Sequence, residues 1–97
     1  METTNEQTAV IKKSQDDNLI IYYGATWCGP CRAMAPTLGQ LEGVINIIKV
    51  DIDECSNLAN GEGIRAVPTI IHYKNGLEVN RVVGGKTKDE IVRLYNS

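Results

Sequence analysis

Hydrophobic residues in this chain of 97 residues fall into short continuous runs separated by segments with helical spacing. The runs at residues 19–23 and 45–52 have the length and composition of strands covered on both faces. Residues 67–83 contain two further apolar runs around Asn75-Gly76, a pair that is typical of a tight hairpin turn. The pattern therefore predicts four strands, the last two of which form a hairpin.

Four other segments have helical patterns. Residues 5–14 predict a short helix, and a second short helix ends near Asn60, with Asp53 or Ser56 as its N-terminal cap. Residues 87–97 predict a closing helix with an apolar face. The longest pattern covers residues 31–43, and the apolar positions at helical spacing are Ala33, Met34, Leu38, Leu41 and, just beyond the range, Val44.

In that longest helix, Gly43 marks the expected end and Pro36 predicts a kink. The whole order of elements is then (β)α-β-α-β-α-β-β-α. Such an order predicts an α/β protein whose mixed sheet carries helices on both faces. Because the chain contains no repeat and no linker-like stretch, we expect a single domain over residues 1–97.

Composition narrows the function classes. Apolar residues make up 42% of the chain, charged residues 23%, and the net charge of −2 gives no basic excess for a nucleic-acid partner. Polar residues follow Met1 and no apolar run reaches membrane-spanning length, so we expect a cytoplasmic protein with no membrane partner. Three cysteines are an odd number, which fits an intracellular redox protein better than a disulfide scaffold.

The stretch WCGPC places Cys28 and Cys31 three positions apart, where a strand passes through a loop into a helix. Free backbone N–H groups at the start of that helix favour a thiolate at Cys28 and make it the better nucleophile. Cys31 lies almost one turn later on the same face, where it can resolve a mixed disulfide. Gly29 allows a substrate backbone to approach, and Pro30 stiffens the link between the sulfurs.

The cysteine pair has two other interpretations. The thiols could be ordinary core residues, although a Gly-Pro loop is a poor core. They could also be half of a zinc site, which requires two further ligands. Only Cys55 and His72 remain as ligands of the usual kind, and they form no second pair, so we expect no metal.

Around the motif, several further segments occur in the order and spacing of one known family. They are Pro36, residues 49–53 (KVDID), residues 63–69 (GIRAVPT), residues 74–76 (KNG) and residues 83–85 (VGG). From about Leu19 to the C-terminus the chain resembles the thioredoxin family. The resemblance implies a thioredoxin fold with a mixed sheet of four to five strands.

The same resemblance implies an activity and its partners. Cys28 attacks a disulfide of a protein substrate, and Cys31 then attacks Cys28 to release the reduced product. A separate thioredoxin reductase recharges the pair, no cofactor is bound, and the protein acts as a monomer. The resemblance also implies a cis peptide between Val67 and Pro68. The implied substrate-binding residues are Trp27, Gly29, Pro30, Ala66, Val67, Pro68 and Gly84.

One position near the motif departs from the family and leaves a neighbouring lysine without its usual partner. Tyr22 stands where the family usually has a buried aspartate that accepts the proton of the second cysteine, and a phenol is a poor base at neutral pH. Lys49 matches the lysine that accompanies this aspartate, and it is a candidate proton relay or electrostatic partner of Cys31. Our hypothesis is that resolution is slow, or that it uses water or Lys49. Whether Asp51 pairs with Lys49 is open.

Four further expectations concern the front of the chain and three single residues. The strand that often opens the family fold is expected to be reduced to two or three residues or absent. Gly24 replaces a frequent aromatic residue and is expected to leave the surface near Trp27 less crowded. Cys55 is interpreted as a small semi-buried residue, and His72 as a packing or edge residue of a strand.

Two other functions remain open from the sequence. The protein could be a non-catalytic interaction subunit that uses the thioredoxin surface to bind a partner enzyme. It could also be an oxidase or isomerase of the same fold, because the direction of electron flow is set by the reduction potential. The Gly-Pro pair favours the reducing direction by family analogy.

Overall fold

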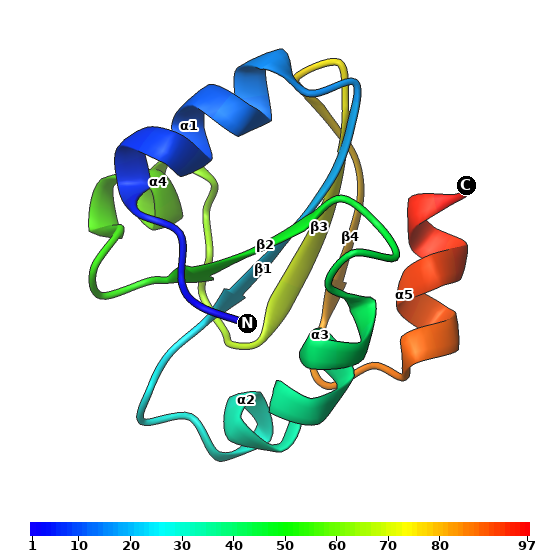
Figure 1. Ribbon diagram of the computed structural model, residues 1–97. Helices are drawn as coiled ribbons and strands as arrows, with labels where there is room; N and C mark the ends of the chain where they lie inside the picture. Colours follow the sequence, from blue (N-terminus) through cyan, green and yellow to red (C-terminus); the bar gives the residue numbers. More distant parts are fainter.

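Four strands form one mixed sheet in the order β2-β1-β3-β4 in the computed structural model, which describes residues 1–97 (Figure 1). The strands are β1 (Asn18–Gly24), β2 (Ile47–Asp51), β3 (Thr69–Lys74) and β4 (Leu77–Val83). β1 runs parallel to β2 and antiparallel to β3, and β3 pairs antiparallel with β4. All four predicted strands are confirmed, and so is the hairpin, whose Asn75 and Gly76 both have positive φ.

Helices cover both faces of this sheet, as the order of elements predicted. α1 (Glu6–Gln15) and α4 (Ser56–Gly61) lie on one face. α2 (Gly29–Ala33), α3 (Ala35–Leu41) and α5 (Lys88–Tyr95) lie on the other (Figure 1). The alternating side chains of the inner strand β1 enter the two apolar cores in turn, which is why residues 19–23 form a continuous apolar run.

The helix predicted over residues 31–43 is two helices in the structure. α2 ends at Ala33, Met34 lies between the helices, and Pro36 occupies the first turn of α3, where its missing N–H is tolerated. The prediction for Val44 was wrong, because α3 ends at Leu41 and Val44 lies beyond it with 61% of its surface exposed. Gly43, at φ +83°, makes the turn between the end of α3 and Val44.

The predicted cap of α4 was also wrong. The N-terminal cap position is Cys55, whose side chain accepts no hydrogen bond from the helix. Asp51 instead organises the loop before it, since its Oδ1 accepts hydrogen bonds from the backbone N–H groups of Asp53 and Glu54 at 2.8 and 3.2 Å. The end of β2 is therefore held to the start of the following loop by a single buried carboxylate.

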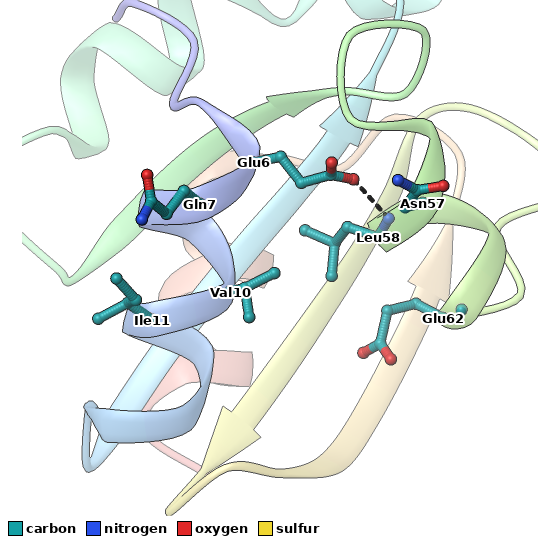
Figure 2. Close-up of a pocket in the computed structure, with 8 residues that line it drawn as sticks. Glu6, Gln7, Val10, Ile11, Asn57, Leu58 and Glu62 are labelled. Carbon is teal, nitrogen blue, oxygen red and sulfur yellow. Dashed lines mark hydrogen bonds between the residues drawn. The ribbon is translucent and has the colours of Figure 1, made fainter.

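A distant residue supplies the missing cap. Glu6, in the first turn of α1, accepts a hydrogen bond from the backbone N–H of Leu58 in α4 at 2.7 Å (Figure 2). The contact crosses the open groove between the two helices, which also contains the half-exposed side chains of Val10 and Ile11. A carboxylate near a helix N-terminus satisfies one of its free N–H groups and stabilises the helix.

The opening strand of the family fold is reduced, as expected from the short front segment. Only Thr3 pairs with Lys49 of the edge strand β2, and the neighbouring Thr4 N–H donates to the Lys49 carbonyl at 2.7 Å. No helix has both the length and the apolar composition needed to cross a membrane.

Candidate active site

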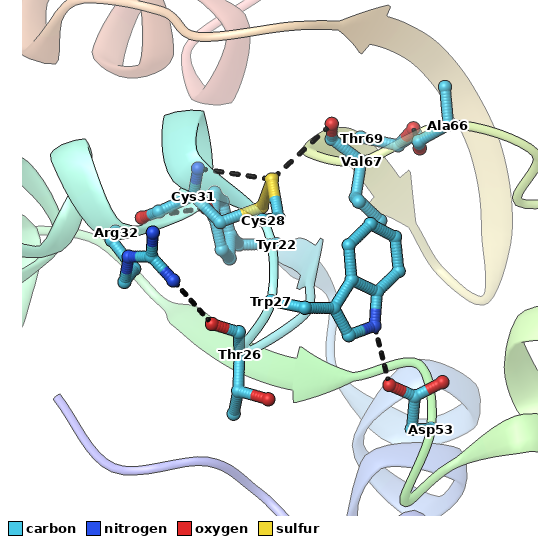
Figure 3. The surroundings of a disulfide bond; sticks show 10 residues. All are labelled: Tyr22, Thr26, Trp27, Cys28, Cys31, Arg32, Asp53, Ala66, Val67 and Thr69. Atoms are coloured by element: carbon cyan, nitrogen blue, oxygen red, sulfur yellow. Dashed lines mark hydrogen bonds between the residues drawn. A yellow bond between two sulfur atoms is a disulfide. The ribbon is translucent and has the colours of Figure 1, made fainter.

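Cys28 and Cys31 form a disulfide at the carboxyl end of β1 (Figure 3). Their Cα atoms are 5.2 Å apart, within the normal range for such a bond, so the predicted pairing of the two sulfurs is sterically possible without backbone movement. Both side chains are buried, at 5% and 7% exposure. No group of three or more histidine, cysteine, aspartate or glutamate side chains is arranged to hold a metal.

Cys28 is the N-terminal cap residue of α2. Its Sγ accepts a hydrogen bond from the backbone N–H of Cys31 at 3.2 Å, while Pro30, inside the first turn, has no N–H to offer. A donor aimed at the sulfur stabilises negative charge on it more than it stabilises the neutral thiol. Cys28 is thus the sulfur of the pair that the local backbone prepares to be a thiolate.

The loop that precedes β3 faces Cys28, because β3 is antiparallel to β1 and Thr69 at its start pairs with Tyr23 near the end of β1. The peptide bond between Val67 and Pro68 is cis, as the resemblance implied, and the Val67 carbonyl oxygen lies 3.6 Å from Cys28 Sγ (Figure 3). Ala66 is exposed and Val67 is partly exposed, whereas Pro68 is buried. Backbone of this loop, rather than the proline ring, is therefore what an approaching chain would meet.

Exposed apolar and backbone surface continues around the disulfide. Trp27 has 63% of its surface exposed, Gly29 and Pro30 are exposed, and Gly84 is partly exposed. The indole Nε1 of Trp27 donates to Asp53 Oδ2 at 2.9 Å, which holds the ring beside the cysteines. Sequence reasoning missed this role for Asp53, because a sequence separation of 26 between the partners gives no local signal.

Tyr22 lies directly beneath α2. Its side chain is fully buried, and its hydroxyl donates to the Cys31 carbonyl oxygen at a long 3.4 Å. Burial raises the pKa of Tyr22 to about 12. The phenol therefore stays protonated at neutral pH and cannot act as the base that a carboxylate would be in its place.

Gly24 provides the space that this ring needs. A Cβ atom at Gly24 would lie 2.8 Å from Tyr22 Cε1 and 3.4 Å from Cys31 Sγ. Because Gly24 is buried and its free space faces Tyr22, it does not relieve crowding at the surface near Trp27, and that expectation was wrong. Tyr22 and Gly24 are a matched large and small pair on one face of β1.

An open cleft of about 260 Å³ adjoins Cys31, and neither Cys28 nor Val67 lines it. It is lined by Tyr22, Ala25, Thr26, Cys31, Arg32, Ala35 and Lys49. Arg32 Nη1 donates to the Thr26 carbonyl oxygen at 3.0 Å, and Lys49 forms no ion pair. In particular Lys49 does not meet Asp51, which is engaged with its own loop.

Cys55 and His72 lie outside the site. Cys55 is only 1% exposed, its Sγ lies 3.7 Å from the Thr4 carbonyl oxygen, and burial raises the pKa of its thiol. His72 is fully buried in β3, which is an inner strand, so the packing interpretation is confirmed and the edge interpretation was wrong.

Comparison with known proteins gives one consistent family. The model of the thioredoxin family matches residues 1–97. A thioredoxin of Chlamydia caviae is 42% identical over 81 residues, which is 80% of this chain and 79% of that protein. Thioredoxin H2-2 of Oryza sativa is 39% identical over 97 residues, covering 97% of this chain and 72% of the relative.

Solved structures agree. Plasmodium falciparum thioredoxin superposes with a TM-score of 0.85 at 31% identity, covering 97% of this chain and 94% of that one. A mutant thioredoxin from Halobacterium salinarum also gives a TM-score of 0.85, at 29% identity, with 97% of this chain and 85% of that one covered.

Proposed function

The chain belongs to the thioredoxin family and is a thiol–disulfide oxidoreductase, and we propose that Cys28 is its nucleophile and Cys31 its resolving thiol. The observation that carries this assignment is the backbone N–H of Cys31, which points at Cys28 Sγ from 3.2 Å. No comparable donor reaches Cys31 Sγ among the hydrogen bonds of the site. The asymmetry favours the thiolate at Cys28 in the reduced protein.

The reaction then proceeds in two exchanges. The Cys28 thiolate attacks one sulfur of a substrate disulfide, the substrate S–S bond breaks, and the freed substrate sulfur takes up a proton. Cys31 loses its proton and attacks the Cys28 sulfur, so that the Cys28–Cys31 bond forms and the second substrate thiol leaves. The substrate gains two electrons and two protons, and the protein is left oxidised.

We propose that the substrate chain lies along the exposed loop at Ala66 and Val67. The Val67 carbonyl, 3.6 Å from Cys28 Sγ, is placed to hold a substrate backbone next to the reacting sulfur. Trp27 and Pro30 supply apolar contact area, and the glycines at 29 and 84 leave room for a chain to approach, with Pro68 holding the loop from beneath.

Resolution at Cys31 lacks a built-in carboxylate. We propose that this step is slow, or that it uses a water molecule or Lys49 as the proton relay, since Lys49 lines the cleft beside Cys31. The test compares Tyr22→Asp with the wild type in an insulin-reduction assay across pH. A new carboxylate should change the pH–rate profile, and identical profiles would rule the hypothesis out.

Disulfide-containing proteins are the substrates of this family, and reduction by thioredoxin reductase is its general route of recharging. For this chain we propose the same reductase, together with a monomeric state, a single domain and a cytoplasmic location, on the strength of family membership. Insulin reduction is measured first with a dithiol and then with thioredoxin reductase and its nicotinamide cofactor. Recharging by glutathione alone would contradict the reductase assignment.

The double variant Cys28→Ser/Cys31→Ser separates catalysis from binding. An oxidoreductase loses all turnover in this variant while the fold and the docking surface remain. If the variant kept the full biological effect of the protein, the interaction-subunit alternative would be correct instead.

A further inference from the structure

The cleft behind Cys31 is positively charged and contains no carboxylate. Its two ionisable side chains other than Tyr22 and Cys31 are Arg32 and Lys49, neither of which forms an ion pair. Asp51 and Asp53 do not line the cleft, and their carboxylates accept hydrogen bonds from the loop after β2 and from the Trp27 indole. Two unpaired cations beside one reacting sulfur are an electrostatic arrangement that favours an anion.

Apart from the Lys49 relay considered above, the side chains beside Cys31 include none suited to remove its proton. Tyr22 is a phenol with its pKa raised to about 12, and its only hydrogen bond is donated to the Cys31 carbonyl. Arginine remains protonated in proteins and cannot serve as a base. Lys49 could take up a proton only after giving one away, because a lysine ammonium offers donors only.

We propose that this cleft binds a small oxyanion from solution, of the carboxylate, bicarbonate or hydrogen phosphate class, which accepts the Cys31 proton during resolution. Lys49 and Arg32 hold the anion, and its oxygen takes the proton as Cys31 attacks the Cys28 sulfur. The Cys28–Cys31 bond forms, the bond to the substrate breaks, and the leaving substrate sulfur is protonated from the anion or from water. No oxidant or reductant beyond the substrate is required.

The dimensions of the cleft fit this occupant. A volume of about 260 Å³ holds a three- or four-atom anion together with several waters, each of which takes ~30 Å³. The buried ring of Tyr22 forms its inner wall, and the exposed Arg32 side chain reaches across to the Thr26 carbonyl. An anion in the cleft therefore lies against Cys31, whereas Val67, the residue next to Cys28 Sγ, does not line the cleft.

The test uses the reduced full-length protein with Cys55→Ala, which removes the third thiol, and 4,4′-dithiodipyridine, a neutral disulfide that brings no carboxylate to the site. Attack by Cys28 releases one coloured thione, and resolution by Cys31 releases a second, so stopped-flow absorbance separates the two steps. Sodium formate is titrated against sodium chloride at constant ionic strength and pH. The rate of the second phase should rise with formate concentration and level off at about tenfold. This acceleration is smaller than the ~100-fold or more that a rigidly positioned base provides. The rate of the first phase should stay constant.

Matched variants identify the site. Lys49→Gln should abolish the formate response of the second phase, whereas Lys12→Gln, which makes the same charge change on α1 at the opposite face of the sheet, should keep it. Arg32→Gln, at an exposed position, should weaken the response and serves if Lys49→Gln does not fold. A second phase insensitive to formate, or a response that is linear and equal in all variants, would overturn the proposal.

This inference rests on the roles proposed for Cys28 and Cys31, and the same experiment separates the two failures. In the same Cys55→Ala background, Cys31→Ser should release one thione per protein at a rate that formate does not change. If Cys31→Ser still released two thiones in two phases, the assignment of the resolving thiol would be wrong. If it released one and the wild type ignored formate, only the anion site would be wrong.

Discussion

Tyr22 and Gly24 lie two positions apart on the face of β1 that carries the disulfide, and neither is explained without the other. The phenol fills the space beneath α2, and the glycine two residues later leaves the gap that the ring enters. A carboxylate at position 22 would be smaller and charged, so the exchange to tyrosine removes both a base and a buried charge from the site.

Tyr22→Phe should leave the rate of insulin reduction nearly unchanged, because the phenol is not the proton acceptor. The variant loses one long hydrogen bond to the Cys31 carbonyl, so the free energy of unfolding should fall by about 0.5–1.5 kcal/mol. Turnover and urea unfolding measure the two effects. A loss of turnover of tenfold or more, with unchanged alkylation of Cys28, would show that the hydroxyl takes part in the reaction.

Gly24→Ala should destabilise the protein by roughly 1–3 kcal/mol, because the new methyl group overlaps the Tyr22 ring, which is itself held in the core. In a Tyr22→Ala background, Gly24→Ala should lower the free energy of unfolding much less. A double-mutant cycle by urea unfolding measures this coupling. Equal costs in both backgrounds would mean that the two residues do not interact.

Among single residues, the sequence predicted the two cysteines that form the disulfide but not all of the contacts around them. The spacing of Cys28 and Cys31 at a strand-to-helix junction was enough, since the geometry of a helix start is local. The contacts of Trp27 with Asp53 and of Tyr22 with the gap at Gly24 depend on tertiary packing, and no periodicity encodes them.

Among the elements, α4 depends on a residue from another helix. It is six residues long, its own cap position forms no side-chain bond, and the Glu6 carboxylate takes over at Leu58. A helix this short has little stability of its own, so it needs contacts from outside. The sequence predicted the helix from its pattern but placed its cap on the nearest polar residues, because sequence-based capping rules are local.

Glu6→Ala should lower the free energy of unfolding by about 1 kcal/mol, as the loss of a helix cap does. It should also speed amide hydrogen exchange at Leu58 more than in β1, since the opening is confined to α4. Glu6→Gln keeps an acceptor oxygen, so its free energy of unfolding should lie between those of the wild type and Glu6→Ala. Unchanged protection of Leu58 in Glu6→Ala would contradict the proposed capping.

At the scale of the whole molecule, two hydrogen bonds through Asn18 connect β1 with the buried His72 of β3 and with Tyr95 of α5. Asn18 donates through Nδ2 to the Tyr95 carbonyl, so its Oδ1 is the acceptor for His72 Nε2, and the ring proton resides on Nε2. His72 Nδ1 is buried with no partner. Protonating it would create a buried donor without an acceptor, and burial, helped by the nearby Lys74, accordingly lowers the pKa of His72.

The stability of the protein should therefore fall on mild acidification. Below the ordinary pKa of 6.5, His72 is protonated in the unfolded chain but stays neutral in the folded protein. The free energy of unfolding therefore decreases as the pH falls, by at most about 1.4 kcal/mol per pH unit. The decrease continues until the folded state also takes up the proton. Urea unfolding from pH 8 to pH 5 measures it.

His72→Gln is the control for this titration, because glutamine keeps a donor for Asn18 and has no group that titrates in this range. The difference in unfolding free energy between wild type and variant should shrink as the pH falls. Parallel curves at every pH would show that His72 does not couple protonation to folding.

The overall architecture followed from the sequence because strand runs, helical spacing and the Asn-Gly turn are all contained within short windows. The division of the long helix at Met34 and the end of α3 at Leu41 did not follow, since a proline and a glycine each allow more than one local solution. The resemblance of WCGPC and its flanking segments to thioredoxins supplied the topology.

The measurement that bears most directly on the central claim is site-resolved alkylation of the reduced native protein. Iodoacetamide is added over a range of pH values, and mass spectrometry follows each cysteine separately. We expect Cys28 to be modified first and rapidly near neutral pH, Cys31 later, and the buried Cys55 last. If Cys28 reacted no faster than free cysteine at neutral pH, or Cys31 reacted before it, the assignment of the nucleophile would be contradicted.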